Sequence, residues 1–326
     1  MRAMRNVLVT GGAGFIGSAL VRGLLAEPGI EKVVVVDSLL TGHRRNLTEV
    51  ADRIEFHRSD IRNLAAVEEV CRGIDVVFHQ AAIPSVPRSI KEPELSHSVN
   101  VNGTFNVLLA AHRQGVRRVV YAASSSAYGD TETLPKSEDL SPNPKSPYAV
   151  QKLVGEHYAR TFFDNYRLET VSLRYFNVFG PRQDPASPYS GVISLFCKSA
   201  LQKHAPTIFG DGEQTRDFTY IDNIVRLNLL AAVSPRAPGH TYNGGVGGRI
   251  TLNDLWAQLQ QIEGLDLPAS YSPPRAGDVR DSQADLTAAR RDLGYEPTVD
   301  LNEGLRRTLQ WYRSDSQPAA ITHVET

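Results

Sequence analysis

The seven residues GGAGFIG, at positions 11–17, directly follow the apolar run Val7-Leu8-Val9 and open an amphipathic pattern that continues to Leu25. Glycines spaced in this way allow a tight turn, a close approach of the backbone to a ligand and close packing of a helix on a strand. Such a motif has meaning only between a strand and a helix, and the flanking residues supply both. The spacing therefore predicts a buried strand, a glycine-rich turn and a helix in direct succession.

The first half of the chain repeats this order of strand and helix. Short β-branched runs predict further buried strands at Val33–Val36, Ile54–His57, Val76–His79, Val119–Ala122 and Val171–Tyr175. Helical patterns fall between them at Leu64–Cys71, Val101–His112 and Tyr148–Phe163. Alternation of continuous apolar strands with helices is typical of a parallel sheet that helices cover on both faces. The predicted fold class is α/β, a Rossmann-type doubly wound parallel sheet.

Beyond Asn177 the pattern is less regular. Helical spacing is found at Val192–Leu201, Asn223–Val233, Leu252–Ile262 and Leu301–Tyr312, and short strands are expected within Pro206–Thr215 and at Phe218–Ile221. We predict an NAD-binding domain over residues 1–178, to which residues 217–244 return, and a smaller mixed α/β substrate domain over residues 179–313. Residues 314–326 are polar and are expected to form a flexible tail.

Composition and charge exclude several classes of protein. The 326 residues carry 35 Lys and Arg against 36 Asp and Glu, so the net charge of −1 gives no reason to expect nucleic acid or a membrane as partner. Two distant cysteines, Cys71 and Cys197, support neither a disulfide framework nor a zinc site, and the nine histidines show no metal spacing. The start is too short for a signal peptide and no apolar run reaches membrane-spanning length, so a cytoplasmic protein is expected.

The glycine-rich turn and the residue Asp37 together predict a dinucleotide site. The amides at the start of the first helix can bind the pyrophosphate of such a ligand. Asp37 ends the second expected strand, 20 residues after Gly17. A carboxylate there accepts hydrogen bonds from ribose hydroxyls and repels a 2′-phosphate. Arg44 and Arg45 lie several residues further on, so the pattern favours NAD over NADP.

Tyr148 and Lys152 stand four residues apart, downstream of the serine run Ser124-Ser125-Ser126. Side chains at i and i+4 of a helix point the same way, so the cation can favour the phenolate. Bringing the pKa of tyrosine from about 10 to about 7 needs roughly 4 kcal/mol of preferential stabilisation. One close cation and a bound nicotinamide can supply it, so the pattern predicts a proton acceptor beside a redox cofactor.

In addition to these motifs, the chain resembles the extended short-chain dehydrogenase/reductases. The resemblance runs from about residue 5 to 312 and rests on TGGAGFIG (10–17), DSLLTG (37–42), SDI (59–61), HQAA (79–82), NVNGT (100–104), SSSAYG (124–129), YAVQK (148–152), RYFNVFGPRQDP (174–185), RDFTYIDN (216–223) and RAGDVRDS (275–282). Within that family it resembles the bacterial UDP-N-acetylglucosamine 4-epimerases, in the wider UDP-galactose 4-epimerase group.

The resemblance implies a role for each matching residue. The catalytic trio would be Ser124, Tyr148 and Lys152. NAD would be bound by Gly11, Gly14, Phe15, Ile16, Gly17, Asp37, Asp60, Ile61, Ala81, Ala82, Asn100, Tyr148 and Lys152. The substrate would be bound by Ser85, Ser124, Ser125, Ser126, Asn177, Arg216, Arg275, Asp278 and Ser282, and among these Asn177, Arg216, Arg275 and Asp278 would hold the UDP part. No metal is implied.

The residues after Ser124 distinguish among the reactions of this family. Dehydratases and decarboxylases place a carboxylate close to the catalytic serine or threonine, whereas Ser125, Ser126 and Ala127 follow here. The resemblance therefore implies simple epimerisation. Tyr148, as phenolate, would remove the proton of the sugar 4-hydroxyl while Ser124 shares the hydrogen bond. Carbon 4 would be oxidised to a ketone and then reduced from its other face.

Ser282 indicates which sugar the protein accepts, because relatives restricted to glucose and galactose carry a bulky residue at this position. A serine leaves space for a 2-acetamido group, so UDP-N-acetylglucosamine and UDP-N-acetylgalactosamine are the expected pair. UDP-glucose stays open, and so does UDP-glucuronate, for which Arg182 is a candidate contact and Asp184 a poor neighbour. A non-catalytic NAD-binding sensor is a distant alternative. Helices at Val101–His112 and Tyr148–Phe163 match those of a dimer interface in relatives, so a homodimer is expected.

Overall fold

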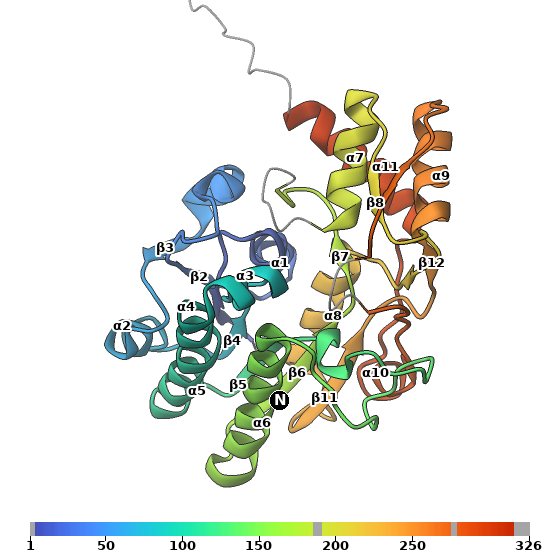
Figure 1. The fold of residues 1–326 in the computed structure, drawn as a ribbon. Helices are drawn as coiled ribbons and strands as arrows, with labels where there is room; N and C mark the ends of the chain where they lie inside the picture. Colours follow the sequence, from blue (N-terminus) through green and yellow to red (C-terminus); the bar gives the residue numbers. More distant parts are fainter. Residues whose placement is uncertain (1–3, 185–190, 275–278, 316–326) are drawn as a thin grey trace, which may run out of the picture.

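A seven-stranded parallel sheet forms the centre of the molecule, as the computed structural model of residues 4–184, 191–274 and 279–315 shows (Figure 1). The strand order is β11-β6-β5-β4-β1-β2-β3. The strands are β1 (Asn6–Thr10), β2 (Lys32–Asp37), β3 (Glu55–Arg58), β4 (Val76–His79), β5 (Arg118–Ser124), β6 (Glu169–Tyr175) and β11 (His240–Gly244). The predicted α/β fold with a doubly wound parallel sheet is confirmed.

The order of the strands reverses next to β1, and this reversal places the ligand site. The chain runs from β1 outward through β2 and β3, then returns to the other side of β1 as β4. Thr10 of β1 is in register with His79 of β4, and the Thr10 hydroxyl lies 2.7 Å from His79 Nδ1. Parallel sheets of this kind open a crevice at the carboxyl ends of the strands where the order reverses.

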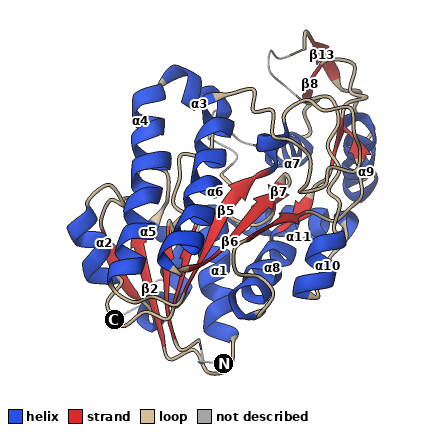
Figure 2. Ribbon diagram, turned by 90° about the horizontal axis from the view of Figure 1, so that it is seen from below, coloured by secondary structure: helices blue, strands red, loops and turns tan. Residues whose placement is uncertain are grey.

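Helices cover both faces of the sheet because successive strand residues point to opposite sides (Figure 2). On one face, Val7 and Val9 of β1 belong to a buried cluster that includes residues of α1 (Phe15–Ala26) and α8 (Ile221–Val233). On the other face, Leu8 belongs to a second cluster that includes residues of α2 (Leu64–Val70), α5 (Thr104–Arg113) and α6 (Pro147–Tyr166). The two clusters are the core of the sheet layers.

The helix expected at Val101–His112 is only part of a longer helical segment. Two short helices, α3 (Val86–Lys91) and α4 (Pro93–His97), precede a π-helical turn at Ser98–Gly103, and α5 continues from Thr104. The prediction missed the earlier start because prolines at the beginning of α3 and α4 interrupt the apolar pattern, although proline suits the first turn of a helix.

The second half packs around a third buried cluster. It is built from α7 (Val192–Gln202), α9 (Leu252–Glu263) and α11 (Leu301–Asp315), with α10 (Thr287–Leu293) placed against β11 and α8 (Figure 1). Three two-stranded sheets complete this part: β7 (Val178–Phe179) with β10 (Thr219–Tyr220), β8 (Thr207–Phe209) with β13 (Ser270–Ser272), and β9 (Thr215–Arg216) with β12 (Ile250–Thr251). Within the described residues, no helix has both the length and the apolar character needed to cross a membrane.

Candidate functional site

A cleft of about 850 Å³ runs along the carboxyl ends of the strands and reaches the second half of the chain. Nearly all of the residues assigned to the site from sequence line it: Gly11, Gly14, Phe15, Ile16, Gly17, Asp37, Asp60, Ile61, Ala81, Ala82, Ser85, Ser124, Ser125, Ser126, Tyr148, Lys152, Asn177, Arg216 and Ser282. Arg275 and Asp278 lie outside the described residues. The fold thus brings residues from both halves of the chain into one cavity.

The glycine-rich turn packs so closely that a side chain at Gly11 or Gly17 would force the backbone to move. Gly11 has φ of +69°, and a Cβ there would lie 2.6 Å from the backbone nitrogen of Ala81. A Cβ on Gly17 would lie 2.1 Å from the carbonyl oxygen of Gly11. Gly14, the N-cap residue of α1, has no side chain to cap the first amides of the helix. The turn therefore leaves donors at the cleft for an anionic group, as a pyrophosphate requires.

Asp37 is held at the end of β2 with its carboxylate in the cleft. Its oxygens accept hydrogen bonds from the amides of Ala13 at 2.9 Å and Leu39 at 2.8 Å. Burial raises the pKa of Asp37, and these two amides act against that shift. Each oxygen keeps a further lone pair that can accept from a ribose hydroxyl. The guanidinium of Arg44 stacks 4.2 Å from the centre of the Phe56 ring and does not line this cleft.

Two residues that are expected to contact the cofactor, Asp60 and Asn100, form hydrogen bonds with other groups of the protein. The Asp60 carboxylate accepts hydrogen bonds from Nε and Nη2 of Arg62 at 3.0 and 2.7 Å, and these bonds lower the pKa of Asp60. Asn100 is not among the residues that line the cleft, and its expected contact with the cofactor stays a prediction. Its side chain accepts from the amide of Ile83 at 2.8 Å and donates to Gln151 at 2.9 Å. Asn100 thus supports Ile83, which lines the cleft.

The three residues of the expected catalytic trio meet at the middle of the cleft. Ser124 ends β5, while Tyr148 and Lys152 come from the first two turns of α6. Ser124 Oγ accepts from Ser126 Oγ at 2.8 Å. Lys152 Nζ donates to the carbonyl oxygen of Ala122 at 2.8 Å, so its ammonium is fixed to the same strand that ends in Ser124. Helix and strand together bring a phenol, a hydroxyl and an ammonium to one place.

The electrostatics of this trio differ in one respect from the sequence prediction. Burial raises the pKa of Tyr148, and a hydrogen bond with Ser124 acts against the shift. Burial also lowers the pKa of Lys152 to about 8, against the influence of Glu156. The expected lowering of the Tyr148 pKa toward 7 is therefore not produced by the protein groups alone. Desolvation of a phenolate is the larger effect, and Lys152 donates to Ala122.

At the far end of the cleft, Asn177, which follows β6, contacts two segments that lie 40 and 105 residues further along the chain. Asn177 Nδ2 donates to the carbonyl oxygen of Asp217 at 3.1 Å and to Ser282 Oγ at 3.4 Å. Ser282 is 7% exposed, and both side chains border the cavity. This arrangement leaves a small hydroxyl at the wall where the resemblance implied a gate for the sugar.

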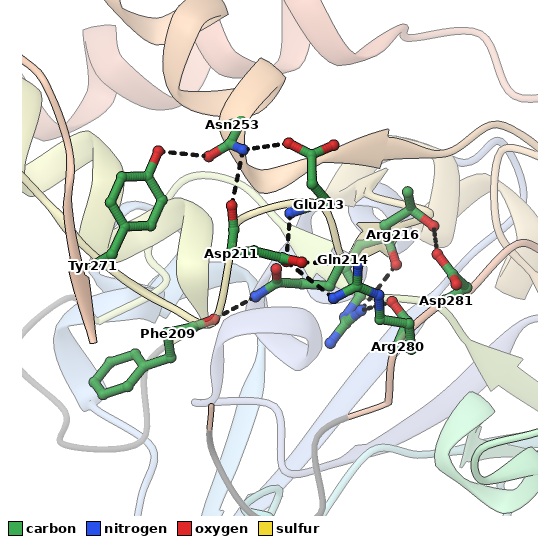
Figure 3. Close-up of polar contacts among 10 residues, drawn as sticks. Phe209, Asp211, Glu213, Gln214, Arg216, Asn253, Tyr271, Arg280 and Asp281 are labelled. Atoms are coloured by element: carbon green, nitrogen blue, oxygen red, sulfur yellow. Dashed lines mark hydrogen bonds and ion pairs between the residues drawn. The ribbon is translucent and has the colours of Figure 1, made fainter. Parts of the chain in front are cut away.

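Arg216 reaches the cleft from a network of polar contacts (Figure 3). Its Nη1 donates to the carbonyl oxygens of Thr215 at 2.9 Å and Arg280 at 3.0 Å. Arg280 in turn forms a bidentate ion pair with Asp211, at 2.9 and 3.1 Å. These bonds hold a planar guanidinium at the cavity, the geometry that suits a diphosphate.

Sequence reasoning missed two residues close to the site. Lys136 lines the cleft although it is only 2% exposed, and its Nζ donates to the carbonyl oxygen of Gly129 at 2.9 Å. Glu156 is buried behind Lys152, and its spacing of four residues on the same helix could have revealed it. No comparable signal marks Lys136. No group of three or more His, Cys, Asp or Glu in the described part of the chain could hold a metal ion.

Comparisons with known proteins agree with this geometry. The model of the NAD dependent epimerase/dehydratase family matches residues 7–245. The UDP-glucose 4-epimerase of Mycolicibacterium smegmatis is 39% identical over 321 residues, which cover 96% of this chain and all of that protein. The structure of Thermotoga maritima UDP-glucose 4-epimerase with UDP-glucose is similar, with a TM-score of 0.91, 39% identity, and 96% and 100% of the two chains covered. The structure of Methanobrevibacter ruminantium UDP-N-acetylglucosamine 4-epimerase, in complex with UDP-N-acetylmuramic acid, has a TM-score of 0.91, 36% identity, and 95% and 99% coverage.

Proposed function

The chain belongs to the NAD-dependent epimerase/dehydratase family and is a UDP-sugar 4-epimerase of it, and from there we propose that it interconverts UDP-N-acetylglucosamine and UDP-N-acetylgalactosamine. The observation that carries the choice of sugar is Ser282, a small hydroxyl on the cleft wall that is hydrogen-bonded to Asn177. UDP-glucose and UDP-galactose are a second pair, since a small gate admits the smaller sugar too.

NAD fits the first half of the cleft. Gly14 leaves the first amides of α1 without a side-chain cap, so they can donate to a pyrophosphate, and Asp37 presents a buried acceptor for the adenosine ribose. Lys152 would bind the ribose next to the nicotinamide. When bound, NAD supplies a reversible acceptor for the hydrogen of carbon 4. The family to which the chain belongs uses this cofactor.

The protein groups supply the proton chemistry in this proposal. Tyr148 accepts the proton of the 4-hydroxyl. It returns this proton after the keto sugar has rotated to present its other face. Ser124 shares that hydrogen bond, and Ser126, which donates to Ser124 Oγ, holds the serine in place. Ser125, Ser126 and Ala127 follow Ser124, so the turn after this serine brings no carboxylate to the sugar. This absence favours return of the ketone to an alcohol over loss of water.

The remaining substrate contacts are proposed from position and resemblance. Ser85, which also caps α3, and Ser125 lie on the sugar side of the cleft. Arg216, together with Arg275 and Asp278 beyond the described residues, would hold the UDP group.

Replacing Ser282 by tyrosine tests the choice of sugar. We expect kcat/KM for UDP-N-acetylglucosamine to fall at least tenfold relative to kcat/KM for UDP-glucose, because the ring fills the space of the acetamido group. Ser282→Ala is the matched control, since it removes the hydroxyl and keeps the space. An unchanged preference in Ser282→Tyr contradicts the proposed gate.

UDP-glucuronate is the less favoured substrate. Arg182, the candidate contact for its carboxylate, already pairs with Glu49 at 2.7 Å, and Asp184 lines the same cavity. A substrate carboxylate would therefore meet Arg182, which is already paired with Glu49, and the negative charge of Asp184. A purely NAD-binding sensor is also less favoured, because Tyr148 and Lys152 are both present.

A homodimer is proposed through helices α5 and α6. Phe105 on α5 and Val150 on α6 are large apolar side chains with 36% and 46% of their surface exposed. Tyr166, at the end of α6, is 51% exposed. These side chains are exposed on two adjacent helices, where a second subunit would cover them. Light scattering of the purified protein gives the mass directly, and a monomer would contradict the proposal.

A further inference from the structure

A buried ion pair lies behind the cleft, between helix α6 and strand β6. Arg174 donates from Nε to Oε1 of Glu156 at 3.0 Å and from Nη2 to Oε2 at 2.8 Å. Both side chains are 6% exposed, and neither is among the residues that line the cleft. Removing two charges from water offsets most of their attraction, so such a pair is weak evidence for a role in stability. Its position gives a better account of it.

Glu156 continues the helical face that carries Tyr148 and Lys152. The three residues are spaced by four along α6, so their side chains follow one another on one side of the helix. Lys152 and Glu156 are both buried there. The carboxylate is therefore the next side chain beyond the ammonium on this face.

Arg174 fixes that carboxylate to the sheet at the level of the reacting groups. It is in register with Ala123 of β5, the residue between Ala122, which accepts from Lys152, and Ser124. Its guanidinium also lies 4.6 Å from the centre of the Tyr128 ring. Buried charged groups in proteins are paired, and Arg174 is the partner that holds the Glu156 carboxylate in place.

The other titratable neighbours of Lys152 carry no negative charge that could stabilise its ammonium. Burial, and then Lys152 itself, lower the pKa of His79 on β4 to about 3, so the imidazole is neutral. The ring centre of Tyr121 on β5 lies 5.1 Å from Lys152 Nζ, and burial raises the Tyr121 pKa well above its usual range. Tyr148 is the group that reacts. Among the described residues facing Lys152, Glu156 is thus the one with a charge opposite to the ammonium.

We propose that Glu156, held by Arg174, is a positioning residue of the epimerase that keeps Lys152 protonated and directed at the cleft. Glu156 acts through Lys152 and touches neither substrate nor cofactor. The inference rests on the proposed roles of Tyr148 and Lys152. The charge of Glu156 is important here because burial lowers the pKa of Lys152 to about 8. At this pKa, a small further decrease would deprotonate the ammonium near neutral pH.

The test is the pH dependence of kcat and KM for epimerisation of UDP-N-acetylglucosamine and UDP-glucose by wild type and Glu156→Gln. We expect the alkaline limb of kcat to move to lower pH by at least about half a unit, since one opposite charge is lost near the ammonium. KM should change less than about twofold, because Glu156 does not line the cleft. Glu156→Asp, which keeps the charge, should restore the limb toward its wild-type position.

The proposal is overturned if Glu156→Gln lowers kcat or the melting temperature but leaves the limb in place. It is also overturned if the wild type shows no alkaline limb below about pH 10. Should Glu156→Gln not fold, the double variant Glu156→Gln, Arg174→Met, which leaves no charge unpaired, is expected to shift the limb in the same direction. The variant Lys152→Ala distinguishes a failure of the proposed function from a failure of this inference. Near-wild-type turnover in that variant refutes the proposed site, whereas an inactive Lys152→Ala beside an unmoved limb refutes this inference alone.

Discussion

Replacing Gly11 by alanine is expected to weaken NAD binding far more than the backbone strain alone would. At φ of +69° any residue with a Cβ costs roughly 1–2 kcal/mol. The new Cβ would also lie 2.6 Å from the backbone of Ala81, whereas ordinary contact begins at 3.4 Å, so the turn must move by about 0.8 Å. Hydrogen bonds from its amides tolerate only a few tenths of an ångström. We therefore expect the Kd for NAD to rise at least tenfold, or about 1.4 kcal/mol.

Gly73 provides a matched control for this experiment. It also has φ of +69°, but nothing lies within 4 Å of the place its Cβ would take. Gly73→Ala should lower the free energy of unfolding by roughly 1–2 kcal/mol and leave NAD affinity unchanged. Urea denaturation gives the first quantity and calorimetric titration with NAD the second. If Gly11→Ala binds NAD as the wild type does, or if both variants lose affinity equally, the close approach to Ala81 is not what shapes the site.

Tyr148→Phe should retain bound cofactor and lose about 10²–10⁴-fold in kcat, as expected for removal of the proton acceptor, and single-turnover absorbance of reduced cofactor would show whether the chemical step is lost. Near-wild-type turnover would contradict the assignment. Asp217 is fully buried, and desolvation raises its pKa to about 6 against hydrogen bonds from the amides of Val246, Ala284 and Gly247. Because the folded protein holds this proton more tightly than the unfolded chain, the contribution of Asp217 to stability is present below about pH 4. It is lost as the pH rises to about 6, at roughly 1.4 kcal/mol per unit. Asp217→Asn should remove that part of the pH dependence of the unfolding free energy. An identical slope in both proteins would show that Asp217 does not titrate in this range.

Local patterns were sufficient for most of the first half of the fold. The strands expected at Val33–Val36, Val76–His79 and Val119–Ala122 are present as β2, β4 and β5, within a residue or two at most of their ends. Buried parallel strands are continuously apolar, so they are easy to recognise. Strand β11, with the sequence HTYNG, was not recognised, because only its pairing with β6 in the sheet makes it a strand.

The candidate site divides in the same way. Gly11, Asp37 and the Tyr148–Lys152 pair could be found from sequence, because each depends on spacing within one turn, strand end or helix. Asn100 could not be placed, because an amide beside the cofactor and an amide that supports Ile83 have the same sequence pattern. The bond between Asn177 and Ser282 joins residues 105 positions apart, and no local pattern reports it.

The amino-acid sequence by itself determined most strands of the sheet, the class of cofactor and the groups available for chemistry, because periodicity and motif spacing act over short stretches of chain. Only the tertiary structure decided which of those groups meet and what charge they hold. It set the ammonium of Lys152 against Ala122, brought Arg174 to Glu156 and removed enough water from around Tyr148 to raise its pKa. The reason is physical: the energy of a charge depends on how much water and which opposite charges surround it, and both are properties of the packed molecule.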